Sequence, residues 1–193
     1  MLFKEDKKRT MEKLEYAVKN NFVDKEIMPL VNKINEKENY YTTSSCIGRC
    51  GIMEFPKNKT PKIYSKWLGK WHHYGTEEEL ITAINNKSND FSSIVFIMNS
   101  PILHIACENI DYAKKLLECG YHNGLKASSI KSVNNNRIIV EILTTYKVDA
   151  PIGLNNKLIV NLDYLKILLK TGNEKLKLAR QNLNRFYNKL DNL

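Results

Sequence analysis

The C-terminal segment 163–190 constrains the fold of this chain most strongly, because it is predicted to form one long amphipathic helix. Its apolar residues recur every three or four positions and share one face: Leu165, Leu169, Leu176, Ala179, Leu183, Tyr187 and Leu190. The opposite face is basic and polar. Helices of this kind owe most of their stability to packing of the apolar face. We therefore expect the segment to dock on a sheet formed by the rest of the chain.

The elements before this helix predict an α+β fold. Helical patterns cover 3–19 and 23–35, and the strand-like and helical stretches that follow are 40–46, 50–55, 67–74, 76–86 (helix), 92–98, 102–107, 111–119 (helix), 127–133 and 137–144. Strand 50–55 is expected to pair with strand 40–46. Gly120 is expected to end the helix 111–119. This order favours a mixed or antiparallel sheet with flanking helices and a long C-terminal helix. Only 8 glycines and no G-x-G-x-x-G argue against a Rossmann-type fold.

The run Tyr40–Arg49 places hydroxyls, a thiol, a glycine and an arginine at the end of a predicted strand. Gly48 permits a tight bend, which would direct Ser44, Ser45 and Arg49 toward a common point. Hydroxyl and backbone donors beside a guanidinium suit a carboxylate or a phosphate. The run therefore predicts an anion-binding site, and the alternative is an ordinary β-turn with a solvated arginine.

Length, net charge and cysteine pattern limit the number of domains, the kind of partner and the location expected for this protein. The 193 residues predict one domain, 1–193, and the net charge of 30 − 21 = +9 favours a polyanionic partner such as nucleic acid. The four cysteines form no C-x-x-C pair, no segment resembles a signal peptide, and no apolar run approaches the roughly 20 residues that span a bilayer. We expect a cytoplasmic protein that does not enter membranes.

Five segments, in this order, resemble the tRNA wybutosine-synthesising protein 3 family: 43–49 (Thr-Ser-Ser-Cys-Ile-Gly-Arg), 69–71 (Gly-Lys-Trp) with His73, 100–107 (Ser-Pro-Ile-Leu-His-Ile-Ala-Cys), 124–128 (Gly-Leu-Lys-Ala-Ser) and 182–187 (Asn-Leu-Asn-Arg-Phe-Tyr). The resemblance runs from about Asp24 to the C-terminus. It implies an S-adenosyl-L-methionine (AdoMet)-dependent methyltransferase acting on the N-4 nitrogen of the 4-demethylwyosine-type base beside the anticodon of tRNA(Phe), in wybutosine biosynthesis. Its expected partner is that anticodon loop, with no obligatory protein partner.

Methyl transfer mainly requires two reactants held in line, so no catalytic triad is expected. With the resemblance counted, we assign residues to three roles. His104 and Asp24 are the catalytic candidates, and no metal ligand is assigned. The cofactor candidates are Ser45, Cys46, Gly48, Arg49, Trp71 and Ser128, and the RNA candidates are Lys126, His73 and Lys177.

Each assignment has a structural alternative. Cys46 and Trp71 are alternatively core side chains, and His104 a hydrogen-bonded histidine within an apolar strand. Asp24 is alternatively a helix N-cap, and Glu141, a further acidic candidate, a solvent-facing strand residue. The charges of the RNA candidates are alternatively ordinary surface charges.

Two other functions stay open. A non-catalytic RNA-binding module would explain the charge and the aromatic residues without a methyl donor. A zinc protein is the third class, although its candidate ligands do not have the usual spacing: Cys46, Cys50, His72, His73 and Cys107.

Overall fold

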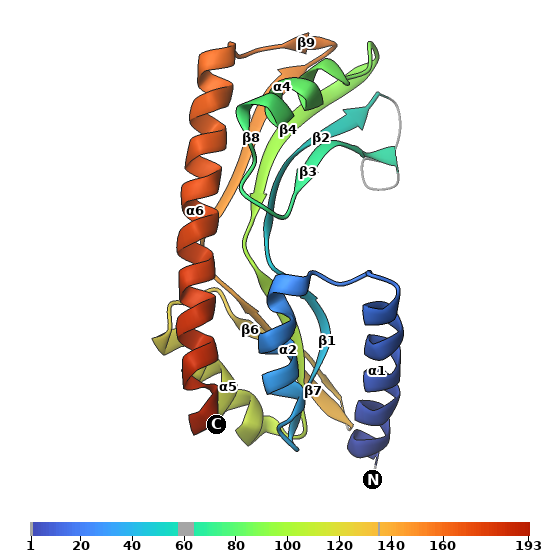
Figure 1. Cartoon of the computed structure of the whole chain (residues 1–193), viewed down its shortest axis with the longest axis vertical. Helices are drawn as coiled ribbons and strands as arrows, with labels where there is room; N and C mark the ends of the chain where they lie inside the picture. Colours follow the sequence, from blue (N-terminus) through green and yellow to red (C-terminus); the bar gives the residue numbers. More distant parts are fainter. Residues whose placement is uncertain (1, 58–63, 135) are drawn as a thin grey trace. The chain divides into compact units, whose positions relative to one another are not determined.

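The computed structural model describes residues 2–57, 64–134 and 136–193, and the chain divides into two compact units (Figure 1). The first unit contains Met1–Ile47, Pro101–Thr145 and Ala179–Leu193. The second unit contains Gly48–Ser100 and Tyr146–Leu178. Each unit is therefore assembled from separate segments of the sequence.

The first unit is built on a four-stranded antiparallel sheet in the order β1-β5-β7-β6. Its strands are β1 (Tyr40–Cys46), β5 (Ile102–Cys107), β6 (Ser129–Asn134) and β7 (Arg137–Leu143). Its helical elements are α1 (Leu2–Lys19), η1 (Lys25–Ile27), α2 (Met28–Asn35), α5 (Ile110–His122), the C-terminal part of α6 (Leu162–Lys189) and η2 (Leu190–Asn192).

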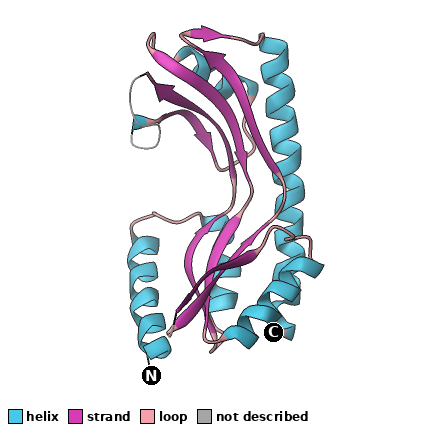
Figure 2. Cartoon of the chain, turned by 180° about the vertical axis from the view of Figure 1, so that it is seen from behind, coloured by secondary structure: helices cyan, strands magenta, loops and turns pink. Residues whose placement is uncertain are grey.

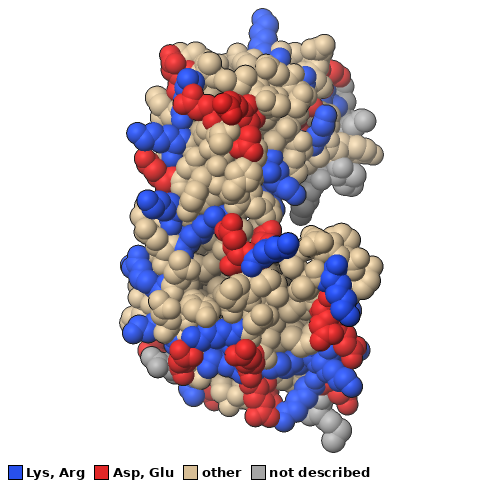
Figure 3. Space-filling model, in the orientation of Figure 1, with Lys and Arg blue, Asp and Glu red and all other residues tan. Residues whose placement is uncertain are grey.

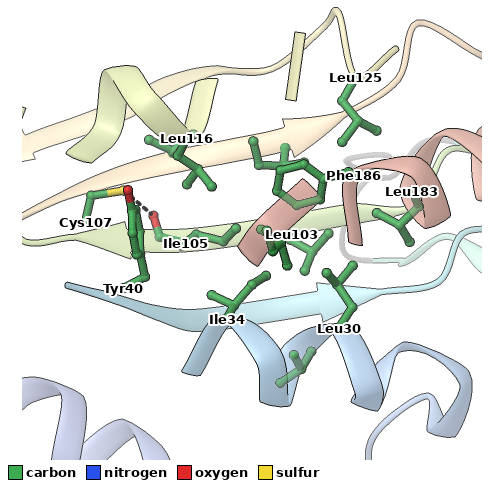
Figure 4. Close-up of a cluster of buried hydrophobic side chains, with 14 of the residues drawn as sticks. Leu30, Ile34, Tyr40, Leu103, Ile105, Cys107, Leu116, Leu125, Leu183 and Phe186 are labelled. Carbon is green, nitrogen blue, oxygen red and sulfur yellow. Dashed lines mark hydrogen bonds between the residues drawn. The ribbon is translucent and has the colours of Figure 1, made fainter. Parts of the chain in front are cut away.

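The two faces of this sheet carry different helices. On one face, α2, α5 and the end of α6 enclose the apolar core, in which Leu103, Ile105 and Phe186 are fully buried (Figure 4). On the other face, α1 packs through Phe3 against Tyr41 and Ala106. Successive side chains of a strand point to opposite faces, so β5 contributes side chains to both faces of the sheet.

The second unit is built on a five-stranded antiparallel sheet in the order β3-β2-β4-β8-β9. Its elements are β2 (Arg49–Pro56), β3 (Lys66–Trp71), α4 (Glu77–Asn85), β4 (Phe91–Asn99), β8 (Lys147–Leu154), β9 (Lys157–Leu158) and the first part of α6. A capping box starts α4: the Glu79 N–H donates to Thr76 Oγ1 at 3.2 Å, and the Thr76 N–H donates to Glu79 Oε2 at 2.9 Å. The sequence-based prediction of this helix is confirmed.

The α+β class with antiparallel strands and a long C-terminal helix is confirmed (Figure 2). The predicted apolar face of α6 is also correct, since Leu165, Leu176 and Leu183 are each at most 4% exposed. Lys and Arg side chains lie at intervals along the α6 side of the face in Figure 3, interspersed with Asp and Glu. That the chain acts as one domain stays a prediction.

Two local expectations were wrong. Strand β2 pairs with β3 and β4, whereas β1 pairs with β5. Gly120 lies inside α5 rather than at its end, and a β-carbon there would lie 3.3 Å from Ile142 Cδ1, so glycine allows the helix to approach β7 closely. The helix ends before Gly124, whose φ of +87° suits glycine.

Candidate functional site

Four polar side chains, one from each strand, form a hydrogen-bonded row across the four-stranded sheet. Ser44 Oγ of β1 lies 2.7 Å from His104 Nδ1 of β5. His104 Nε2 lies 3.0 Å from Glu141 Oε2 of β7, and Glu141 Oε1 lies 2.6 Å from Lys131 Nζ of β6. We call Ser44, His104, Glu141 and Lys131 the polar row. It follows the spatial order of the strands without a gap.

Strand register brings the row together. A β-bulge between Thr42 and Ser44 sets Ser44 directly opposite His104, and His104 is opposite Glu141 in the next pair. Lys131 lies at a second bulge, where the β6–β7 register shifts. Bulges redirect side chains, and here they place the two outer members of the row within reach of the inner ones.

The row is partly open to solvent. The side chains of His104 and Glu141 are 30% and 13% exposed, whereas the neighbours of His104 on its strand, Leu103 and Ile105, are fully buried on the opposite face. His104 is therefore not a histidine of the apolar core. Its ring has hydrogen-bond partners on both nitrogens and an accessible edge.

The partners of His104 define its tautomer. A carboxylate can only accept hydrogen bonds, and Glu141 accepts both from Lys131 and from His104 Nε2. With the hydrogen on Nε2, the lone pair of neutral histidine lies on Nδ1, where the Ser44 hydroxyl donates to it. The row thus presents a basic nitrogen and a hydroxyl at the open side of the sheet.

Asp24 fixes the end of β1. It precedes η1 but makes no side-chain capping bond; instead, Asp24 Oδ2 accepts the Ile47 N–H at 3.0 Å. The Ile47 carbonyl accepts from Arg180 Nε at 3.2 Å. The turn after Ser45 and Cys46 is therefore held from two sides, and the half-buried Ser45 and Cys46 lie just before it.

Ser128 lies at the same end of this sheet as Cys46. In the strand register, Cys46 is opposite Ile102, and Ile102 is opposite Leu143, whose N–H donates to Ser128. Ser128 Oγ donates to the Leu125 carbonyl at 2.6 Å and accepts the Leu143 N–H at 3.1 Å. Its hydroxyl thus closes the loop between α5 and β6. Its predicted role as a cofactor contact stays a prediction.

The remaining predicted cofactor residues belong to the second unit. Gly48 has φ +83°, as its place at the bend predicted. The Arg49 guanidinium carbon lies 5.2 Å from the centre of the Trp67 ring, and Arg49 Nε is buried without a hydrogen-bond partner among the described residues. A buried donor left unpaired is costly, so this nitrogen favours an added acceptor.

Trp71 is only 6% exposed. A β-carbon on Gly69 would lie 2.5 Å from Trp71 Cζ2, and one on Gly75 would lie 3.1 Å from Trp71 Cε3. The two glycines therefore make room for the ring inside the second unit. This packing favours the core alternative for Trp71 over stacking on a ligand.

The predicted RNA contacts are all at the surface. His73 Nε2 lies 2.8 Å from Glu79 Oε1 in the second unit, which also carries the exposed Lys177 on α6. The Lys126 ammonium lies 5.6 Å from the centre of the Tyr121 ring in the first unit. Contact with RNA stays a prediction for all three.

In the first unit, the structure groups His104 with Ser44, and Asp24 with the turn that follows Ser45 and Cys46. Sequence reasoning missed Lys131 and left Glu141 as an alternative. The available signal was Glu141 itself, a charged residue inside the apolar run 138–142. Two candidate zinc ligands, Cys50 and Cys107, are fully buried cysteines of strands β2 and β5, an environment typical of packing.

Within the described ranges, no helix combines the length and apolarity needed to cross a membrane.

The structure is similar to solved structures of archaeal proteins. The PH1069 protein of Pyrococcus horikoshii matches with a TM-score of 0.90 and 36% identity, covering 98% of this chain and 94% of that one. A hypothetical protein from Aeropyrum pernix matches with a TM-score of 0.74 and 25% identity, covering 88% of this chain and 98% of that one. The neighbours share this α+β fold.

The family described as Methyltransferase TYW3 matches residues 5–192, and the chain belongs to this family. The resemblance found in the sequence is thereby confirmed. The tRNA(Phe) 7-((3-amino-3-carboxypropyl)-4-demethylwyosine(37)-N(4))-methyltransferase of Methanocaldococcus jannaschii is 61% identical over 193 residues, covering 100% of this chain and 99% of that protein. A relative from Pyrococcus abyssi with the same activity in its name is 38% identical over 191 residues, covering 99% and 97%.

Proposed function

We propose that this protein methylates the N-4 nitrogen of the 4-demethylwyosine-type base beside the anticodon of tRNA(Phe), with AdoMet as the methyl donor. The observation that carries the proposal is the 61% identity to the Methanocaldococcus jannaschii methyltransferase over the whole chain. The net charge of +9 supports an RNA substrate. We further propose that the protein acts in the cytoplasm and contacts the anticodon loop.

The polar row supplies the acid–base step of this proposal. A ring nitrogen that carries hydrogen must lose that proton when it gains a methyl group. His104 Nδ1 accepts the proton, directly or through the Ser44 hydroxyl that lies 2.7 Å away. Glu141 holds the ring through Nε2 and stabilises the imidazolium that forms, and Lys131 holds Glu141. Positioned general bases contribute about 10²–10⁴-fold to a rate.

Arg49 is the residue best suited to bind the methyl donor, AdoMet. When bound, AdoMet supplies an electrophilic methyl group on a sulfonium, together with a carboxylate. The unpaired Nε of Arg49 and its planar guanidinium, which lies over the Trp67 ring, suit that carboxylate. Ser45, Cys46, Gly48 and Ser128 are proposed as further donor contacts.

The function is tested by mixing the protein with AdoMet and tRNA(Phe) from a strain that lacks this gene, then measuring the mass of the modified nucleoside. We expect a gain of one methyl group, absent when AdoMet is omitted. A non-catalytic RNA-binding module would bind the tRNA and leave the mass unchanged. That result would overturn the proposal.

Arg49→Ala tests the donor site separately. Loss of a charge-assisted hydrogen bond costs about 1.5–3 kcal/mol, so AdoMet affinity measured by calorimetry should fall roughly 10- to 100-fold. Arg49→Lys keeps the charge without the fork and should recover only part of the affinity. Wild-type affinity in a folded Arg49→Ala protein would remove Arg49 from the donor site.

A further inference from the structure

The chain leaves α1 through a fixed turn that ends at Phe22. Asn21 has φ +55°, its N–H donates to the Val18 carbonyl at 3.1 Å, and the Phe22 N–H donates to the Ala17 carbonyl at 2.9 Å. These two bonds and the left-handed residue form a Schellman motif. The backbone of Phe22, and hence the direction of its side chain, is set by the helix.

The Phe22 side chain is nevertheless 74% exposed, more than any other large apolar side chain among the described residues. In a Schellman motif this position usually packs on the preceding helical turn. Tyr16 and Val18, on the last turns of α1, are also exposed, by 65% and 42%. Single exposed apolar residues are ordinary, and Tyr16 and Val18, two positions apart, lie on different sides of α1; Phe22 differs because it is exposed at a position that normally packs on its helix.

This helix end is tied to the candidate site. Asp24, two residues after Phe22 and therefore at most about 7 Å along the chain, accepts the Ile47 N–H at the end of β1. At its other end, helix α1 packs through Phe3 against Tyr41 and Ala106, on the face of the sheet that carries His104. Figure 1 shows α1 beside β1, with the loop that follows α1 leading to α2.

We propose that Phe22 stacks on a nucleobase next to the one being methylated. This inference rests on the proposed function and adds the residue that handles the neighbouring base. A base within an RNA stack must be separated from its neighbour before a ring nitrogen can reach His104, and this separation costs free energy. An aromatic ring that covers the exposed face of the neighbour offsets that cost.

Charge at this helix end also suits RNA. Lys19 and Lys25, which flank Phe22 in sequence, are both exposed and can approach phosphates, whereas the exposed Glu26 beside Lys25 is paired with Arg180 at 3.2 Å. A protein partner would use the apolar surface but would not require a flat π-face. The test therefore asks whether binding requires an aromatic ring at position 22 or only an apolar side chain of similar size.

The test compares Phe22→Ala, Phe22→Leu and Phe22→Trp in binding to tRNA(Phe) at one salt concentration without AdoMet. We expect about 5- to 100-fold weaker binding for Phe22→Ala, little recovery for Phe22→Leu, and near wild-type binding for Phe22→Trp. Tyr164→Ala is the control: Tyr164 is an exposed tyrosine, 43% accessible, on α6 in the second unit, and it is not among the proposed RNA-binding residues. It should bind as wild type does.

Melting temperatures of all variants are measured on the same samples. Wild-type affinity for Phe22→Ala, full recovery by Phe22→Leu, or a loss that follows the folded fraction would each overturn the inference. Binding is read without a methyl donor, so failure of the proposed function is seen separately. A wild-type protein that binds tRNA(Phe) through Phe22 but never methylates it would overturn only that function.

Discussion

The two faces of the four-stranded sheet are made by the same strands but have opposite properties. One face buries Leu103 and Ile105 completely under α2, α5 and α6. The other carries His104, between these two residues in sequence, with both ring nitrogens hydrogen-bonded and 30% of the side chain exposed. Under the proposed function, neighbouring positions on β5 serve stability and chemistry separately, and substitutions at them should have separable effects.

The polar face is itself divided. Where α1 covers it, Tyr41 OH donates to Asp6 Oδ2 at 2.5 Å, and Arg137 pairs with the same carboxylate and lies 2.9 Å from the Tyr41 oxygen. The Tyr41 hydrogen bond, helped by Arg137, lowers the pKa of Asp6, while partial burial opposes the shift. Burial, together with Asp6, raises the pKa of Tyr41 to about 12. Asp6, Tyr41 and Arg137 thus hold α1 on the sheet, whereas the polar row is partly exposed to solvent.

The largest expected effect is on catalysis. His104→Ala should lower the single-turnover methylation rate by about 10²–10⁴-fold while changing the melting temperature little, because the ring is not part of the apolar core. His104→Asn keeps one hydrogen-bonding group near Nδ1 and should lose less. If activity simply followed the folded fraction, His104 would be a structural residue and the contrast between the faces would fail.

Leu103→Ala should have the opposite effect: it should lower stability and leave the methylation rate per folded molecule nearly unchanged. Removing a fully buried leucine side chain costs about 2–5 kcal/mol of unfolding free energy, depending on how far the cavity collapses. Denaturant titration measures this loss. The rate per folded molecule should stay near that of the wild type, and a larger drop would show that the core face also positions the polar row.

Glu141→Gln tests whether the row positions His104. The amide keeps the shape but weakens the contact with His104 Nε2, so turnover should fall about 10-fold with a shifted pH–rate profile. The groups facing His104 in the row are Ser44, Glu141 and, through Glu141, Lys131. Glu108→Gln is the control, since this exposed carboxylate contacts Asn39 instead. Equal rates and profiles for both variants would contradict a positioning role.

The smallest effect concerns pH and α1. Because the folded-state pKa of Asp6 lies below its ordinary value of 3.8, the unfolded chain binds this proton first as the pH falls. The stabilisation from Asp6 is therefore complete above about pH 4 and is lost as the pH falls through the lower, folded-state pKa. Asp6→Asn should flatten that part of the stability curve, measured by urea unfolding at several pH values. An unchanged curve would mean that Asp6 does not hold α1 through its charge.

Much of this fold follows from local pattern. The capping box at Thr76, strand β1 and the apolar face of α6 depend on neighbouring residues, and the sequence predicted each correctly. The partner of β1 was mispredicted because pairing with β5 depends on long-range packing that local periodicity does not encode. Strand β8 was missed because Asp149 and Pro151 obscure its pattern; Pro151 lies at a register shift, where a missing N–H is tolerated.

The candidate site was predictable only in part. His104 was singled out because a histidine in an apolar strand requires hydrogen-bond partners, and Glu141 was noted as an acidic candidate. Lys131 carried no signal, since its contact depends on a bulge in a strand that looks like an ordinary polar edge. The orphan Nε of Arg49 is likewise a property of three-dimensional packing.

The core of the first unit draws on both ends of the chain, and this has a consequence for synthesis on the ribosome. Leu30 and Ile34 of α2 are translated long before Leu183, Phe186 and Leu190, which pack in the same core. At roughly 5–20 residues per second, roughly 8–30 s separate Ile34 from Phe186. Once β7 has been synthesised, the nascent sheet exposes an apolar face until Leu183 and Phe186 of α6 follow, and native folding of this unit requires the segment that contains Leu190.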